Sequence, residues 1–373
     1  YNDAMSVTIE PVEIRSPEDP ALEQLCQQLR ELSDALDFQD ENGQSPWPQR
    51  QLDLCGQYGV FRWFLDEEFG GLGWSDRELT EGYLALSSAC QTTTFIITQR
   101  TGACRRIALS GNAFAREQLI APLLNGSQFS TVGISHLTTS RRHLANPVLA
   151  AEETDSGFIL NGFSPWVTGG IHADTIVVGA ELKDGRQILT VVPTDVSGVH
   201  AETPADLVAL SGSHTGKVSF TDVYVDAKWL LAGPVENVMA AGIGARTGGL
   251  QTSTLALGLS GAAIEFIFSE AEKRTDLLPP AQALRNERES LKQILLQSAS
   301  GDESCGTETL RQHCNSLVLR STQAALSAAK GMGFVTGHPV GRWCREALFF
   351  MVWSCPQPVV NAQLCQLAGI SVE

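Results

Sequence analysis

The sequence predicts an α+β multidomain protein, with a helical domain in residues 1–127, an antiparallel β-barrel or sheet domain in 128–232 and a helical bundle in 233–373. Before about residue 125 and after about residue 235, apolar residues recur every three or four positions, which is the period of amphipathic helices. Between these stretches, short segments rich in Val, Ile, Phe and Thr alternate with Gly, Asp, Asn and Pro, as in strands. No helix-length segment separates the strands, so the pattern favours an antiparallel sheet or barrel over a doubly wound parallel sheet.

The first domain carries three helix signals. From Pro20 onward, one stripe of apolar residues follows the helix period: Leu22, Leu25, Cys26, Leu29, Leu32 and Leu36. Ser75 and Glu78 have the spacing of a capping box, which predicts a second helix that begins there. Residues 92–124 continue as helix, with a break near Gly111 and Asn112.

The later elements follow in order along the chain. The predicted strands are 129–135, 148–152, 157–160, 174–182, 187–193 and 217–225. The predicted C-terminal helices are 238–273, 281–299, 308–330, 339–352 and 358–367.

Composition excludes several classes of protein. With 26 basic and 42 acidic residues among 373, the net charge is −16, whereas nucleic-acid binding needs Lys and Arg that displace counterions from phosphates. The basic clusters Arg105–Arg106 and 141–143 are expected on solvated faces. No uninterrupted apolar segment reaches the ~18–20 residues of a membrane span. Nine cysteines show no C-x-x-C pair and no metal-ligand spacing with the seven histidines, which predicts reduced thiols, a cytoplasmic location and no metal site.

Four segments in the same order resemble motifs of the acyl-CoA dehydrogenase family of flavoproteins. They are LDEEFGGLG (65–73), LNGFSPWVTGGIHAD (160–174), SGSHTGKVSFTDVYV (211–225) and GMGFVTGHPVGRWCREA (331–347). The resemblance covers nearly the whole chain. It implies the acyl-CoA dehydrogenase fold, FAD as cofactor and assembly as a homodimer or homotetramer.

The resemblance also implies which residues bind FAD. Trp166 offers an aromatic face to the flavin and Thr168 a hydroxyl to its reactive edge. Arg274, Gly331 and Gly333 fall where the family binds the pyrophosphate and adenine of FAD across a subunit interface. Thr138 falls in the flavin-lining segment after a small shift of register.

The departures from the family concern the catalytic base. The family removes a proton next to a thioester with a Glu, and its two known positions fall here on Ser354 and Gly248. Loss of a general base costs roughly 10² to 10⁴ in rate or more, so ordinary acyl-CoA dehydrogenation is expected to be absent or very slow. His136, in the altered flavin-lining segment, is the nearest alternative base, although a hydrogen-bonded histidine at a strand end is the favoured interpretation.

Three functions stay open from the sequence. The first is an acyl-CoA dehydrogenase-like oxidoreductase with a small-molecule substrate, a CoA thioester being the candidate, and an electron-transfer flavoprotein as acceptor. The second is a flavin-dependent monooxygenase on the same fold, served by a flavin reductase. The third is a catalytically degenerate flavoprotein-like binding protein.

Overall fold

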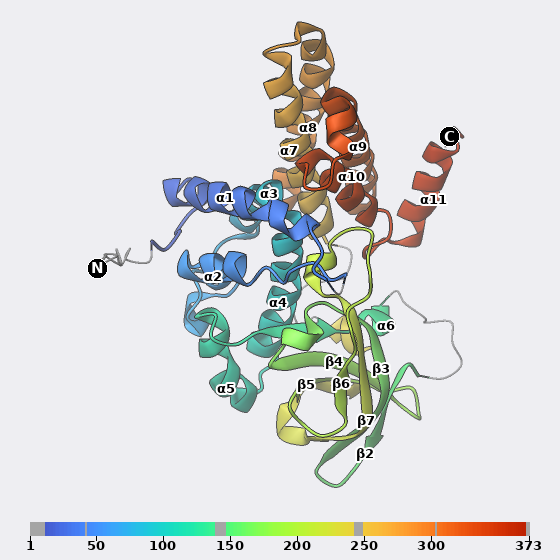
Figure 1. Cartoon of the computed structure of the whole chain (residues 1–373). Helices are drawn as coiled ribbons and strands as arrows, with labels where there is room; N and C mark the ends of the chain where they lie inside the picture. The colour runs from blue at the N-terminus through green and yellow to red at the C-terminus, as the bar shows by residue number, and fades with distance from the viewer. Residues whose placement is uncertain (1–11, 42, 139–146, 242–248, 303, 371–373) are drawn as a thin grey trace.

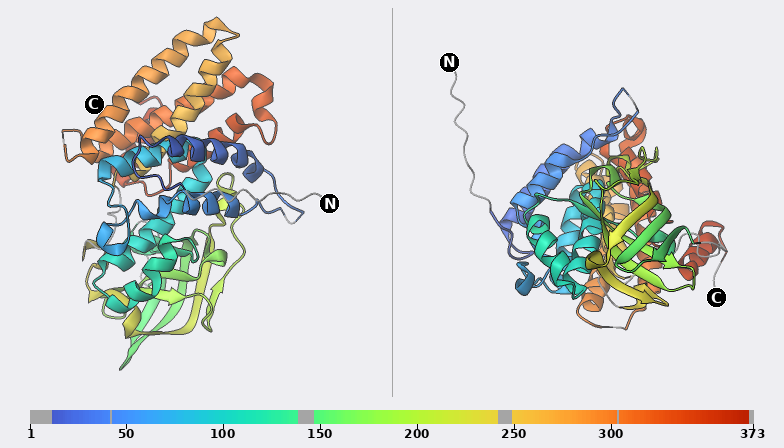
Figure 2. Two further views of the ribbon diagram at one scale, coloured as in Figure 1. Left: turned by 90° about the vertical axis from the view of Figure 1, so that its left-hand side faces the viewer. Right: turned by 90° about the horizontal axis from the view of Figure 1, so that it is seen from below.

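The computed structural model describes residues 12–41, 43–138, 147–241, 249–302 and 304–370. Within them, the elements fall into a helical, a β and a second helical stretch, in the order that the sequence predicts (Figure 1). The sheet lies at one end of the molecule and the C-terminal helices lie at the other. The first N-terminal helix lies along the base of the C-terminal helices (Figure 2).

Local signals in the sequence set the ends of the N-terminal helices. These are α1 (Pro20–Ser33), α2 (Gln49–Gln57), α3 (Asp76–Ala89), α4 (Gln91–Leu109) and α5 (Ala113–Leu124). Asp19 caps α1, and Ser75 and Glu78 form both halves of the predicted capping box at α3. Asn112 caps α5 at the predicted break. The predicted N-terminal helices therefore form where the sequence places them, whereas the sequence pattern does not predict α2.

The strands build one sheet. They are β1 (Ser130–Gly133), β2 (Leu149–Glu153), β3 (Gly157–Val167), β4 (Thr175–Leu182), β5 (Gln187–Pro193), β6 (Val199–Ala201), β7 (Gly216–Asp226) and β8 (Leu230–Val235). Their order is β6-β7-β3-β2-β4-β5-β8, with β1 also beside β4. A four-residue helix, α6 (Ser135–Thr138), follows β1.

Of the two predicted forms, an antiparallel sheet or a barrel, the structure has an open sheet, and not all of its strands are antiparallel. The sheet does not close, because β6 and β8 end the path without pairing with each other in the described residues. It is also mixed, since β1 and β2 both run parallel to β4 and pair with successive parts of it. The long connections from β1 and β2 to β4 permit a parallel pairing that a tight hairpin would forbid.

The C-terminal helices are α7 (Gln251–Ala271), α8 (Leu278–Ala299), α9 (Thr307–Ala329), α10 (Pro339–Phe349) and α11 (Gln357–Leu367). The predicted helix 238–273 begins too early. A 3₁₀ helix, Val238–Ala241, precedes α7, and residues 242–248 lie outside the described part of the chain.

The most apolar helix, α7, joins the two helical parts. Its residues Leu255, Leu257 and Leu259 are buried in one core with Leu25 of α1 and Leu86 of α3. Among the described residues, α7 alone is long and apolar enough to cross a membrane, but 72% of its most apolar window is buried inside the protein. The shared core accounts for its apolar sequence, and it fixes α3 against the start of α7.

Candidate active site

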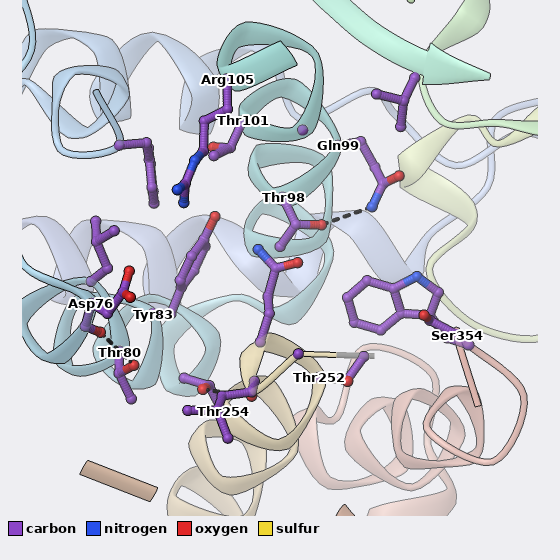
Figure 3. Close-up of a pocket in the computed structure, with 18 of the residues that line it drawn as sticks. Asp76, Thr80, Tyr83, Thr98, Gln99, Thr101, Arg105, Thr252, Thr254 and Ser354 are labelled. Atoms are coloured by element: carbon purple, nitrogen blue, oxygen red, sulfur yellow. Dashed lines mark hydrogen bonds between the residues drawn. The ribbon is translucent and has the colours of Figure 1, made fainter. Parts of the chain in front are cut away.

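A cavity of about 580 Å³ lies where α3, α4, β1 and the first turn of α7 meet the segment that follows α10. This volume is within the range of small-molecule sites. Its polar lining comes from several elements (Figure 3): Asp76, Thr80, Tyr83, Thr98, Gln99, Thr101, Arg105, Arg106, Ser135, Gln251, Thr252, Thr254, Ser298 and Ser354. Residues far apart in the sequence therefore share one chamber between the helices and the sheet.

Trp166 presents an open aromatic face to this cavity. The next residue, Val167, is completely buried in the core of the sheet. Because successive side chains of a strand point to opposite faces, Trp166 points away from that core. Its side chain is 51% exposed and lines the cavity. A planar ligand can therefore stack on it.

Thr168 belongs to a chain of buried hydroxyl groups. Its Oγ1 lies 3.0 Å from Oγ1 of Thr215, which lies 2.8 Å from Oγ of Ser213. Three hydroxyl groups carry three hydrogens, and the two bonds use two of them. One hydroxyl hydrogen therefore remains that these two bonds do not use.

Ser354, which falls at the position of the catalytic Glu in the motif resemblance, lies in the wall of the same cavity. Its φ of 46° is in the left-handed region. Gly249, next to the alternative position, lines the same cavity, while Gly248 itself lies outside the described residues. Among the described lining residues, Asp76 is the single carboxylate, and it lies across the cavity from Ser354 (Figure 3).

His136 is held away from the cavity. Its ring is buried, and Nε2 lies 2.7 Å from the carbonyl oxygen of Gly179. Burial lowers the pKa of His136, so the ring is neutral near pH 7. It is not among the residues that line the cavity, which fits the favoured sequence interpretation of a strand-end histidine. Thr138 ends α6, and its side chain lies outside the described part of the structure.

Arg274, Gly331 and Gly333 come together at a separate place in the C-terminal bundle. Nη2 of Arg274 donates to Glu270 at 2.9 Å and to the carbonyl oxygen of Ala328. Ala328 lies just before the 3₁₀ helix Lys330–Phe334, which contains both glycines. The three predicted residues thus share one region, outside the cavity that holds Trp166.

The sequence did not predict the charged side of the cavity, which is the part lined by Asp76, Tyr83, Arg105 and Arg106. Arg105 and Arg106 were expected on a solvated face, but both line the cavity and Arg106 is only 4% exposed. The Tyr83 hydroxyl reaches the same chamber. The sequence carries little local sign of this, because α4 mixes polar and apolar residues without one clear apolar stripe. The second basic cluster, 141–143, lies outside the described residues.

Known proteins share similarity with this chain in sequence and in fold. No protein-family model matches the chain. The short-chain specific acyl-CoA dehydrogenase of Mus musculus is 25% identical over 321 residues, which are 81% of this chain and 78% of the relative. Butyryl-CoA dehydrogenase from Megasphaera elsdenii has a TM-score of 0.74 at 17% identity and covers 93% of this chain and 97% of its own.

A further solved structure, a glutaryl-CoA dehydrogenase from Mycobacterium smegmatis in complex with FADH2, has a TM-score of 0.76 at 16% identity. It covers 98% of this chain and 100% of its own. The fold is therefore the three-part α+β fold of acyl-CoA dehydrogenases. By sequence and fold together, the chain is similar to acyl-CoA dehydrogenases over most of its length.

Proposed function

We propose that the chain is an FAD-dependent oxidoreductase that acts on an acyl-CoA thioester or a related substrate in the 580 Å³ cavity. One observation carries the proposal. The half-exposed indole of Trp166, the serine at the usual base position and the start of α7 all line one chamber, although they lie about 85 or more residues apart. Family motifs that converge on one cavity support a common substrate site there.

The residues present fit a flavin. Trp166 supplies an open ring for stacking, and the hydroxyl chain that ends at Thr168 holds one hydrogen for a polar edge. At Gly331, an added Cβ would meet nothing within 4 Å, so the backbone there is open to a ligand. Both hydrogen bonds of Arg274 to described residues use Nη2, so its Nη1 and Nε can donate to a phosphate.

Bound FAD would supply the electron acceptor for oxidation of the substrate. The chain's own residues would position the substrate and exclude water from it. Ser354 carries a neutral hydroxyl near pH 7, so it cannot take the proton that the family's Glu removes. We therefore infer that oxidation of a simple saturated acyl-CoA is slow.

The residues predicted to bind FAD lie in two separate regions, one at Trp166 and one around Arg274 and Gly331. This separation supports an FAD site that is shared between subunits of an oligomer. Beside Gly331, three apolar residues close together in the sequence are exposed: Met332 by 62%, Phe334 by 82% and Val335 by 53%. Single exposed apolar residues are common on protein surfaces, whereas a patch of them marks a site of interaction. We infer that a second copy of the chain covers this patch in a homodimer or homotetramer. Substitution of Phe334 by Asp is expected to shift the protein to smaller species in size-exclusion chromatography with light scattering. An unchanged mass would contradict the inference.

A flavin-dependent monooxygenase is the second candidate function. It is favoured by the absence of a carboxylate beside Ser354 and Trp166 in the described cavity wall, since such an enzyme needs no base for a proton next to a thioester. The two functions call for different partners, an electron-transfer flavoprotein for the first and a flavin reductase for the second. For either, the nine free cysteines fit a cytoplasmic location.

The visible spectrum of the purified protein tests the proposal. A flavin spectrum that bleaches with an acyl-CoA thioester supports the dehydrogenase-type function, and hydroxylated product from reduced flavin and oxygen supports the monooxygenase. A colourless protein that takes up no added FAD would overturn both and leave the binding protein. Trp166→Ala should weaken FAD binding at least tenfold with little loss of stability, because the ring is half exposed; Trp229→Ala, at a tryptophan distant from the cavity, is the control.

A further inference from the structure

We propose that the end of the cavity remote from Ser354 binds a carboxylate of the substrate through Arg105 and Tyr83. The substrate would then be a thioester whose acyl chain ends in a second carboxylate. The thioester part rests on the proposed function, whereas the anion site rests on the cavity itself. Figure 3 shows Tyr83 and Arg105 on the side of the chamber opposite Ser354, with Thr98 and Thr252 between.

Arg105 reaches the cavity without a partner. It lies on α4, whose other residues are mostly buried, and its side chain extends toward the Tyr83 hydroxyl (Figure 3). It makes no hydrogen bond and no ion pair with any residue in the described part of the chain. A guanidinium is planar and always charged, and it binds carboxylates through paired N–H donors. An unpaired Arg beside a cavity therefore points to an anionic ligand.

Tyr83 offers a second donor at the same place. Its side chain is 5% exposed, and its hydroxyl has no hydrogen-bond partner of ordinary geometry. Burial raises the pKa of Tyr83 to about 12, although Thr101, Gln251 and Arg105 lie near enough to lower it somewhat. The phenol is therefore protonated at neutral pH and can donate. A buried donor without an acceptor costs free energy, and an anion in the cavity would remove that cost.

The charge balance of the cavity also favours an anion. Arg106 lines the same chamber and is 4% exposed, and burial together with the charge of Arg105 lowers its pKa to about 10. It therefore stays charged at neutral pH. Asp76, the one described carboxylate in the lining, is exposed at the first turn of α3, where water screens it. The described lining is thus net positive in a protein whose net charge is −16.

An aliphatic acyl chain would satisfy none of these groups. It would displace water from the guanidinium and the phenol without offering an acceptor, which is costly for a charged group. A terminal carboxylate would accept from both. The geometry therefore discriminates between acyl chains of equal length by the group at their far end.

Matched thioesters test the inference. The FAD-loaded protein is titrated by calorimetry with glutaryl-CoA and with pentanoyl-CoA, which have five acyl carbons each. We expect glutaryl-CoA to bind at least tenfold more tightly. Arg105→Met should bring the two affinities within twofold, chiefly by weakening glutaryl-CoA, and Tyr83→Phe should reduce the preference severalfold. Arg50→Met, at an exposed site on α2 outside the cavity, should leave it unchanged.

A conservative variant and a second assay complete the test. Arg105→Lys keeps the charge but not the paired donors, so it should retain part of the preference. If neither thioester binds, the thioester function fails, and free glutarate against free pentanoate in a thermal-shift assay decides the anion site. A glutarate-specific rise in Tm that Arg105→Met abolishes supports it. Three outcomes would overturn the anion site. The wild-type protein could bind the two thioesters equally, or its preference could survive Arg105→Met and Tyr83→Phe. In the glutarate assay, a Tm that does not rise in an Arg105-dependent way would also overturn it.

Discussion

At Ser354, a left-handed backbone presents a side chain to the cavity. A non-glycine residue at φ 46° costs about 1 kcal/mol or more, and the surrounding structure must hold it there. Trp353, the preceding residue, stacks on Phe349 with ring centroids 5.1 Å apart and so anchors the segment to the end of α10. The position is therefore built to aim a side chain, although the one it aims is a hydroxyl.

The first prediction restores a carboxylate at this position. Ser354→Glu should leave FAD binding intact, because Trp166, Thr168 and Arg274 are unchanged, and should raise the rate of acyl-CoA dehydrogenation by about tenfold or more. Dye reduction with a panel of thioesters measures the rate. Ser354→Gln has nearly the same shape without the charge and should not raise it. A wild-type protein that already reduces dye rapidly with a simple saturated acyl-CoA would show that a base lies elsewhere.

At the scale of residues, sequence motifs predicted Trp166 and Ser354, because both sit in segments with a recognisable spacing, and both line the cavity. They did not locate the charged side of the cavity. Tyr83 and Arg105 lie on different helices, and only the packing of α3 against α4 brings them together. A lone Tyr or Arg in a helical pattern carries no local sign of such a partner.

Among the elements, α3 positions much of the charged side of the cavity. It carries Asp76, Thr80 and Tyr83, and its capping box fixes where it begins. The Ser75 hydroxyl and amide both donate to Glu78 at 2.7 Å, and these bonds lower the pKa of that carboxyl. The start of the helix and the position of Tyr83 two turns later are therefore coupled.

The second prediction removes the cap. Ser75→Ala should lower the free energy of unfolding by about 1 kcal/mol, measured in urea at pH 7, because the Glu78 amide loses its acceptor. Since the folded-state pKa of Glu78 is lowered, its contribution is present above the unfolded pKa near 4.5 and is lost as pH falls through the folded value. The difference between variant and wild type should therefore shrink at pH 3. Ser75→Asp, which can still cap, should retain most of the stability; equal losses in both variants would count against the cap.

Helices proved easier to predict than strand pairing, for a physical reason. Caps such as Asp19, Ser75 and Asn112 act within three residues, so they are visible in the sequence. The strand β6 has three residues, and β8 contains Gly233 and Pro234, so neither shows a strand pattern. The parallel placement of β1 and β2 beside β4 depends on distant contacts, which alternation alone does not encode.

In the whole molecule, an ionic junction ties the N-terminal part to α10 beside residues of the β part. Arg342 of α10 lies 2.8 Å from Asp34 of the N-terminal part, and the neighbouring Arg345 pairs with Asp37. Glu346, on the same helix, is 2% exposed and lies 3.9 Å from Arg342. Residues 207–211 of the β part line a small cavity over these groups. Arg342 and Glu346 thus form a buried ion pair on α10, and the arginines of this helix also pair with acids about 300 positions earlier in the chain.

The last prediction concerns the pH dependence of this junction. Burial raises the pKa of Glu346 to about 7, more than the positive charge of Arg342 lowers it. In the unfolded chain the carboxyl ionises near pH 4.5, so between pH 4.5 and 7 the folded state binds more protons, and its stability falls as pH rises. The cost is absent below pH 4.5 and complete above pH 7.

Glu346→Gln removes this cost while keeping an acceptor for the Thr92 hydroxyl, and Arg342 keeps Asp34 as its partner. The variant should therefore unfold at a higher temperature than the wild type at pH 8, by up to about 3 kcal/mol in stability, and should differ little at pH 5. Scanning calorimetry at both pH values measures this. Glu289→Gln, at a half-exposed acid on α8, should show no such dependence on pH. A variant less stable than the wild type at pH 8 would mean that the attraction between Glu346 and Arg342 outweighs the cost of burying the carboxylate.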